Sequence, residues 1–355
     1  MKKMIFFCAV LFMAFLRNVY GVEYEIVMDA DSGRVLYGKN IDEKRLIAST
    51  TKIMTTLVVL RNMDLNRELT VGEEVLDAYG SSIYIKPGEK MKVIDMLYGL
   101  MLRSGNDSAL TLAVNTAGSV EGFSILMNET AASIGMKNTT FTNPHGLDEE
   151  TQNTSTVYDM ALLMREAMKN KTFRKITGTK HYKVKTNMNV HDWYNKNELL
   201  SNYKYATGGK IGYTGAARHT FVSSATKDGK NLIVATFVDE NRFITHKKLY
   251  EKYFPLYNKY NLIDKDHLNI NYKPGVRLYT KESFNMLLTE EESKNIVKSV
   301  TLYNDVSIGN DETIIGDISV GLDGVLYKRM KIYGVKANIK ESKSFWKKIK
   351  EFFKW

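Results

Sequence analysis

Three short motifs, in a fixed order along the chain, restrict its fold more than any other feature of the sequence. Ser49-Thr50-Thr51-Lys52 comes first, Ser104-Gly105-Asn106 second and Lys210-Ile211-Gly212 third. Together they offer a nucleophilic hydroxyl, an amine that could deprotonate it, a second hydroxyl, an amide and a second cation. This set of groups is typical of a serine acyl-transfer site. A fold that uses them must bring three distant segments of the chain together.

Each motif is weak evidence when taken alone. The spacing of the first recurs at Ser201/Lys204, Ser224/Lys227 and Ser344/Lys347. Context separates Ser49 from these, because Lys52 to Leu60 is an apolar run of helical character and Ser49 therefore lies where a helix begins. A serine at that position can simply cap the helix. It also has Lys52 one turn away on the same face, within reach of its hydroxyl. The two roles are compatible.

The remaining patterns predict an α+β domain followed by a small all-β domain. The chain has 355 residues, 44% of them hydrophobic, which is enough to bury a sizeable core in two domains. Residues 23–40 read as a hairpin, and helical patterns extend to about residue 135. A helix over 157–168, capped by Ser155 or Thr156, precedes the later strands. Those strands are expected at Lys180–Lys185, Gly209–Tyr213, His219–Thr226 and Asn231–Val238.

These elements define a catalytic domain over 22–262, with an antiparallel sheet that carries Lys210 and a helix from about Thr245 to Tyr257. Residues 263–338 then alternate apolar and polar positions between Gly and Asp turns. They predict a small β-rich domain without a catalytic group. It would hold the catalytic domain off a membrane or meet a partner, and the sequence favours neither.

Residues 1–21 read as a secretory signal peptide. Lys2 and Lys3 precede an apolar stretch from Met4 to Leu16, and Val19 and Gly21 are small enough for a signal peptidase site. An uncleaved anchor is the competing interpretation, but the stretch is shorter than the ~20 residues that a spanning helix needs. We therefore expect an exported protein.

The other terminus predicts a membrane-anchoring amphipathic helix over 341–355. Phe345, Ile349 and Phe352 recur at helical spacing, and residues 343–355 carry five lysines against Glu351. Such a helix suits an anionic membrane surface, where aromatic side chains lie at the headgroup boundary. The alternative is a helix packed on the protein's own body.

Composition excludes several kinds of site. The lone cysteine, Cys8, lies in the signal segment, so the mature chain has no disulfide, thiolate metal site or cysteine nucleophile. The six histidines lack zinc-site spacing, which predicts no metal and no cofactor. The net charge is +10, or +10 − 3 = +7 once Lys2, Lys3 and Arg17 are removed. No nucleic-acid motif accompanies it, and we expect no nucleic-acid partner.

The sequence around the motifs resembles the D-alanyl-D-alanine carboxypeptidases, the low-molecular-weight serine-type penicillin-binding proteins of bacterial cell walls. The resemblance spans about residues 23 to 255. Its matching stretches are 27–37, 47–55, 104–109, 141–147 and 208–214. Five ordered matches are much more specific than any one of them. The resemblance implies a penicillin-binding/β-lactamase-like fold, and peptidoglycan stem peptides ending in D-Ala-D-Ala as substrate.

The resemblance also implies roles for particular residues. Ser49 would be the nucleophile, Lys52 the general base and Ser104 the proton relay to the leaving D-alanine. Asn106 would bind the substrate backbone. The backbone N–H groups of Ser49 and Tyr213 would form the oxyanion hole, and β-lactams would acylate Ser49 as covalent inhibitors.

One position departs from the family pattern. The third motif normally has a hydroxyl residue between Lys210 and Gly212, where this chain has Ile211. Thr214 could supply the hydroxyl if the strand bulged at Gly212, because alternation otherwise places 211 and 214 on opposite faces. Arg242 is a candidate second contact to the substrate carboxylate, or a solvated loop charge.

Three hypotheses about function remain. The first is an exported carboxypeptidase on the outer face of the cytoplasmic membrane, facing the cell wall. The second is a β-lactamase or endopeptidase using the same site, although Glu149 and Glu150 lie in a polar turn and no carboxylate is assignable to a deacylating water. The third is a wall-binding protein whose site has decayed at Ile211.

Overall fold

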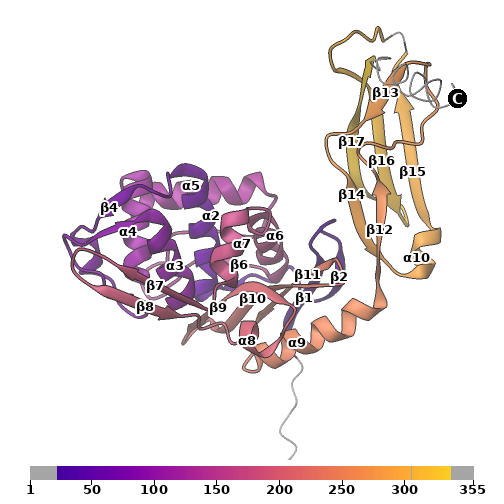
Figure 1. Ribbon diagram of the computed structural model, residues 1–355. Coiled ribbons are helices and arrows are strands. Elements are labelled where there is room, and N and C mark those ends of the chain that lie inside the picture. Colours follow the sequence, from indigo (N-terminus) through magenta and orange to yellow (C-terminus); the bar gives the residue numbers. More distant parts are fainter. Residues whose placement is uncertain (1–21, 305, 337–355) are drawn as a thin grey trace, which may run out of the picture. The chain divides into compact units, whose positions relative to one another are not determined.

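The computed structural model describes residues 22–304 and 306–336, which form two compact units (Figure 1). The first unit consists of residues 22–28, 35–227 and 231–252, and the second of residues 29–34, 228–230 and 253–336. The expected signal peptide (1–21) and amphipathic helix (341–355) lie outside the described residues. The predicted domain boundary after residue 262 falls inside one strand, β12 (Asn258–Ile263).

A five-stranded sheet in the order β2-β1-β11-β10-β9 forms the centre of the first unit. Its strands are β1 (Tyr24–Asp29), β2 (Val35–Lys39), β9 (Ala206–Thr214), β10 (Arg218–Lys227) and β11 (Lys230–Phe237). The β1/β2 and β9/β10 pairs are antiparallel. The predicted α+β architecture, with Lys210 on a strand of this sheet, is confirmed. Because β9 ends the strand order, one of its edges is left unpaired within the sheet.

Helices cover both faces of that sheet (Figure 1). They are α2 (Lys52–Asn62), α3 (Val93–Arg103), α4 (Asn106–Ala117), α5 (Val120–Ser133), α6 (Val157–Ala167), α7 (Lys171–Gly178), α8 (Leu199–Asn202) and α9 (Arg242–Tyr253). The His246 ring of α9 stacks on Phe221 of β10 at 4.2 Å. On the other face, Ser224 of β10 contacts Met168, which ends α6. Of the two candidate caps of α6, Thr156 is the one that accepts the Asp159 N–H.

Short turns and strands complete this unit. The 3-10 turns are η1 (Ala48–Thr51) and η2 (Glu73–Val75). The short strands are β3 (Arg45–Leu46), β4 (Glu68–Thr70), β5 (Lys90–Lys92), β6 (Thr154–Ser155), β7 (His181–Lys185) and β8 (Val190–Tyr194). The β7–β8 hairpin is fixed by a buried contact of 2.7 Å between His191 Nε2 and Glu89 Oε1.

The second unit is rich in β-structure, as predicted. A two-stranded sheet pairs β12 (Asn258–Ile263) with β14 (Phe284–Leu288), and a four-stranded sheet has the order β13-β17-β16-β15. The strands of the larger sheet are β13 (Val276–Tyr279), β15 (Ile296–Leu302), β16 (Thr313–Leu322) and β17 (Val325–Lys336). Apolar side chains from both sheets form its core. One short helix, α10 (Glu290–Lys294), begins with a capping box at Thr289.

The helix expected over 245–257 ends earlier than predicted. The α-helix begins at Arg242 and ends at Tyr253, and the 3-10 turn η3 (Phe254–Leu256) follows it. Pro255 explains the difference, since it has no N–H for the helical ladder and its ring disfavours α-geometry in the residue before it. Within the part of the chain that is described, no single helix is long and apolar enough to cross a bilayer; α4 and α5 meet that test only as a pair bent by 83°.

Candidate active site

Ser49 lies in the 3-10 turn η1, immediately before α2. Its side chain makes no cap hydrogen bond, and the N-cap residue of α2 is Thr51, so the expected cap role is not realised. Ala48, just before it, has a φ of 47°, a left-handed conformation that non-glycine residues rarely adopt. Strain of this kind is concentrated at functional sites. The half-buried Ser49 hydroxyl is directed to a neighbouring lysine.

That neighbour is Lys52, which is fully buried and has three oxygen partners. Its Nζ lies 3.1 Å from Ser49 Oγ, 2.7 Å from Asn106 Oδ1 and 2.6 Å from the carbonyl oxygen of His145. The last two atoms can only accept hydrogen bonds. A neutral amine has two N–H groups for these two acceptors and one lone pair for the Ser49 hydroxyl. The geometry therefore suits a base that takes the Ser49 proton.

Burial and neighbouring charges favour the neutral form of this amine. Burial lowers the pKa of Lys52 well below its usual range, and the positive charge of Lys210 lowers it further. Lys196 acts in the same direction, whereas the Asp107 carboxylate opposes it. Lys210 is also buried, and its pKa is lowered to about 7, first by desolvation and then by Lys196. Lys196 is a neighbour of the site that the motifs did not reveal.

The second motif ends one helix and begins the next. Ser104 follows α3 with a φ of 67°, and its buried hydroxyl has no hydrogen-bond partner among the described residues. An unpaired buried hydroxyl costs roughly 1–3 kcal/mol, so its retention indicates a function. Asn106 opens α4, where its Nδ2 donates to the carbonyl oxygen of Tyr79 at 2.6 Å. This bond fixes Asn106 Oδ1 as the acceptor that faces Lys52.

Asp107 holds the loop beside this motif, a role that sequence reasoning missed. Its carboxylate accepts the backbone N–H groups of Ile83 at 3.1 Å and Ile85 at 3.2 Å. The backbone N–H of Asn106 donates to the carbonyl oxygen of Ser81 at 2.7 Å. The loop over residues 79–85 is therefore fixed against the start of α4.

The third motif brings the edge strand β9 against the nucleophile. Lys210 is 2% exposed, and its Nζ donates to the carbonyl oxygen of Ile211 at 2.8 Å. A Cβ at Gly212 would lie 2.9 Å from the backbone nitrogen of Ser49. Only glycine allows so close an approach without movement. It brings the next residue, Tyr213, near the Ser49 amide.

Thr214 follows simple strand alternation. The β9/β10 register runs without a break from Lys210 to Thr214, so the strand does not bulge at Gly212. Thr214 shares a face with Lys210 and Gly212 and lies opposite Ile211. Its hydroxyl donates to Asp148 Oδ2 at 2.5 Å and accepts the Ala217 N–H at 3.0 Å. The hydroxyl is thus engaged in the turn after β9, and a contact with substrate stays a prediction.

A loop over residues 143–147 supports Lys52 from the other side. Asn143 Oδ1 accepts the Gly146 N–H at 2.6 Å, and Asn153 Nδ2 donates to the Asn143 carbonyl oxygen at 2.9 Å. Gly146 has a φ of +89°, and a Cβ there would lie 1.9 Å from the Ala48 carbonyl oxygen. Burial lowers the pKa of His145 to about 3, with Lys52 contributing, so His145 stays neutral. The matching stretch 141–147 includes Asn143, but not Asn153, which holds the loop from outside it.

Arg242 begins α9, and its Nε is buried without a hydrogen-bond partner in the described part of the chain. Position 211 pairs with Phe221, whose ring contacts Phe243 of α9. Ile211 and the start of α9 therefore lie on the same face of the sheet, opposite Lys210. Arg242 is on the face to which the missing hydroxyl would have projected.

The structure thus joins three distant segments, as the motif order required. Hydrogen bonds connect Ser49, Lys52 and Asn106, and Gly212 packs closely against the backbone nitrogen of Ser49. Ser104 lies two residues before Asn106, and Tyr213 directly follows Gly212, so both belong to the same group of segments. Within the described ranges, no group of three His, Cys, Asp or Glu side chains is arranged to hold a metal ion. The arrangement can activate a serine by a buried amine.

Comparison with known proteins agrees with this chemistry. A family model described as D-alanyl-D-alanine carboxypeptidase matches residues 21–241. The chain is 34% identical over 289 residues to the D-alanyl-D-alanine carboxypeptidase DacF of Bacillus subtilis, an alignment that covers 77% of this chain and 74% of the relative. It is 34% identical to DacC of Escherichia coli, with 78% and 74% covered.

Solved structures of related proteins also superpose on this chain. A D-alanyl-D-alanine carboxypeptidase from Mycobacterium tuberculosis superposes with a TM-score of 0.64 at 34% identity, covering 66% of this chain and 91% of that one. Penicillin-binding protein 5 from Haemophilus influenzae superposes with a TM-score of 0.72 at 24% identity, covering 89% and 97%. The second likeness shows a shared fold over most of the chain.

Proposed function

The chain belongs to the D-alanyl-D-alanine carboxypeptidase family, and on this premise we propose that it removes the terminal D-alanine from peptidoglycan stem pentapeptides through an acyl-enzyme on Ser49. One observation carries the proposal. The buried Lys52 amine is held by two carbonyl acceptors, Asn106 Oδ1 and the His145 carbonyl oxygen, and its third direction faces Ser49 Oγ.

Acylation follows from this arrangement. Ser49 Oγ forms a bond to the carbonyl carbon of the penultimate D-alanine while its proton passes to the lone pair of Lys52. The carbonyl oxygen gains negative charge, which the backbone N–H groups of Ser49 and Tyr213 would stabilise. The proximity of Gly212 to the Ser49 nitrogen supports this pair of donors.

Collapse of the tetrahedral intermediate breaks the bond to the terminal D-alanine. The proton taken up by Lys52 then passes through the Ser104 hydroxyl to the leaving amine nitrogen. A relay must donate and accept in turn, which an otherwise unpartnered hydroxyl can do. Water next attacks the ester carbonyl and gives its proton to Lys52. Ser49 recovers a proton as the shortened peptide leaves with a free carboxylate.

The substrate carboxylate needs a cation, and two are candidates. Lys210 is buried beside the nucleophile, so its charge would be poorly screened. Arg242 lies on the sheet face of Ile211, where the usual hydroxyl is missing, and its Nε has no partner among the described residues. We assign the carboxylate to Lys210; because Arg242 lies on the opposite face of the sheet, it would contact the carboxylate only by reaching around the edge strand β9.

Location is part of the proposal. The apolar stretch at residues 4–16 supports export, and the basic amphipathic pattern over 343–355 supports attachment to an anionic membrane surface. The enzyme would then act on the outer face of the cytoplasmic membrane, where stem peptides are accessible.

The test is D-alanine release from a synthetic stem pentapeptide by the full chain. We expect release by the wild type and none above background by Ser49→Ala. The same peptide ending in L-Ala-L-Ala is the matched substrate control and should remain intact. A wild-type chain that binds the pentapeptide but leaves it unchanged would instead indicate a decayed wall-binding protein.

A further inference from the structure

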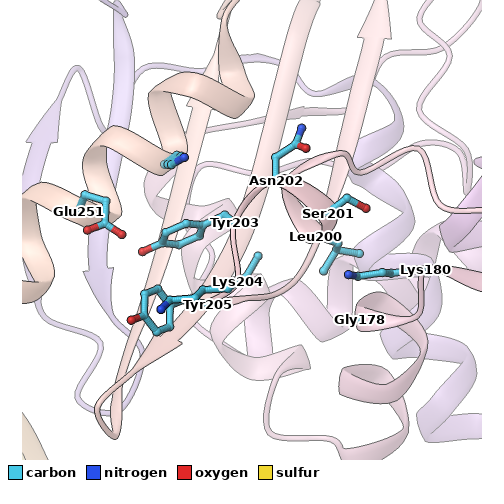
Figure 2. Close-up of a pocket in the computed structure, with 11 residues that line it drawn as sticks. Gly178, Lys180, Leu200, Ser201, Asn202, Tyr203, Lys204, Tyr205 and Glu251 are labelled. Atoms are coloured by element: carbon cyan, nitrogen blue, oxygen red, sulfur yellow. The ribbon is translucent and has the colours of Figure 1, made fainter.

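A hollow lies in the first unit, away from Ser49. It has a volume of about 720 Å³ and lies among the end of α7, the short helix α8, the first residue of β9 and one side of α9 (Figure 2). Its β9 residue, Ala206, is seven positions before Tyr213, a span of roughly 23 Å along a strand. The hollow is therefore distinct from the acyl-transfer site.

Three lysines line this hollow, which we call the lysine pocket: Lys180, Lys204 and Lys247. No carboxylate forms an ion pair with any of them within the described residues. The one acidic side chain in the lining is Glu251, whose Oε2 lies 3.6 Å from Nζ of Lys227. The pocket therefore has an excess of positive charge that the protein does not neutralise.

A rigid tyrosine lines the same pocket. Tyr203 is 4% exposed, and its buried hydroxyl interacts with the carboxylate of Glu251, which lines the pocket beside it. Its ring stacks on Tyr250 at 5.8 Å and meets Tyr205 edge-on at 5.5 Å, which fixes its position. Burial raises the pKa of Tyr203, and the Glu251 carboxylate raises it further, so the group remains a donor. Figure 2 shows Tyr203 between Ser201 and Lys180 on one side and Glu251 and Tyr205 on the other.

We propose that the lysine pocket binds phosphate groups of a linear phosphodiester polymer. Lysine ammonium groups act as point charges suited to phosphate oxygens, whereas planar carboxylates are matched best by the arginine fork, and no arginine lines the pocket. Tyr203, fixed by its ring contacts with Tyr250 and Tyr205, forms a rigid wall beside these lysines. A hollow of this size accepts a ligand of several units rather than a single ion.

This inference goes beyond the proposed hydrolysis and does not depend on it. It gives an exported wall enzyme a contact that retains it near an anionic polymer while Ser49 acts on peptides. Binding should weaken as salt is added, because the lysines are exposed and their charges are screened.

The test measures binding of a short glycerol-phosphate oligomer to the full chain in a non-ionic detergent. Removing two exposed ionic contacts in Lys204→Ala/Lys247→Ala should weaken binding about tenfold. Lys248→Ala is the matched control, because Lys248 is an exposed neighbour on α9 outside the pocket lining, and it should bind within about twofold of the wild type.

Several results would overturn the proposal. One is no binding of the oligomer to the wild-type chain at low salt, and another is an equal loss in Lys248→Ala. Equal binding of polyglutamate would contradict the assignment to phosphate, and binding only to phosphatidylglycerol vesicles would indicate a membrane contact instead. Ser49→Ala should bind the oligomer as tightly as the wild type, so failure of this site and failure of the hydrolase assignment give different results.

Discussion

Replacing Asn106 by aspartate tests whether Lys52 acts as a neutral base. The change keeps the size of the side chain and places a carboxylate about 2.7 Å from Lys52 Nζ. Two unit charges at that distance attract by about 6 kcal/mol at an effective dielectric constant of ~20. Shifts measured for adjacent opposite charges are about 1–3 pKa units. We therefore expect the pKa of Lys52 to rise by about 2 units.

The sign of the effect on rate follows directly. A higher pKa keeps more of Lys52 as the ammonium at neutral pH, and the fraction of free base falls by up to about 100-fold for 2 units, the full factor applying where both pKa values lie above the pH. Acylation of Ser49 at pH 7 should fall by the same factor. The fold should tolerate the change: the new ion pair stabilises it, whereas the aspartate oxygen facing the Tyr79 carbonyl oxygen costs about 1–3 kcal/mol.

The assay is single-turnover acylation by a fluorescent penicillin across pH 6–10, with Asn106→Ala as the control. Below the raised pKa of Lys52, the Asn106→Asp rate should climb about tenfold per pH unit where the wild-type rate is level. Asn106→Ala lacks the carboxylate, so its lower rate should run parallel to the wild type. A full rate for Asn106→Asp at pH 7, or a deficit that stays constant across the range, would refute the neutral-base argument.

Three further predictions concern stability and pH. Gly146→Ala places a Cβ 1.9 Å from the Ala48 carbonyl oxygen at a φ of +89°, so urea unfolding should show a loss of about 3 kcal/mol or more; wild-type stability would contradict the close packing. Ser104→Ala removes a buried, unpartnered hydroxyl, so the melting temperature should hold or rise while D-alanine release falls about 100-fold, and a loss of both would indicate a structural role. Because the pKa of Lys210 is about 7, kcat/KM should decline as pH rises above 7 and the ammonium loses its proton. Lys210→Arg, which stays charged, should remove that decline, and an unchanged alkaline limb would reject the role of Lys210.

The local part of the site was predictable from sequence. The contact between Ser49 and Lys52 depends on helical spacing, and the position of Lys210 on a strand follows from the alternation around it. The motif order also indicated that Asn106 would join them. Such features depend on a few neighbouring residues and on periodicity, which a single sequence records.

The remaining parts depend on contacts between distant segments. Asn143 and Asn153 shape the loop that presents the His145 carbonyl oxygen to Lys52, yet no spacing rule connects them to that lysine. Asp107 follows a motif residue directly, but its bonds to Ile83 and Ile85 run backwards to an irregular loop. These partners are set by how the chain folds back on itself.

The lysine pocket could not be predicted from the sequence either, because it depends on contacts between distant segments. Lys180, Lys204 and Lys247 come from three separate segments of the chain and form no motif. The end of α9 illustrates a different error, because the apolar periodicity continues to residue 257 while Pro255 prevents the helix from following it. There the sequence does contain the local signal that ends the helix, Pro255.

The most direct test of the account is the intact mass and peptide map of the full chain after exposure to a penicillin, with Ser49→Ala beside it. We predict one penicilloyl group per chain, located on Ser49 and absent from the variant. An unmodified chain with unaltered drug, or an adduct on another residue, would contradict the assignment of Ser49 and Lys52. Rapid drug hydrolysis without an accumulated adduct would point to a β-lactamase instead.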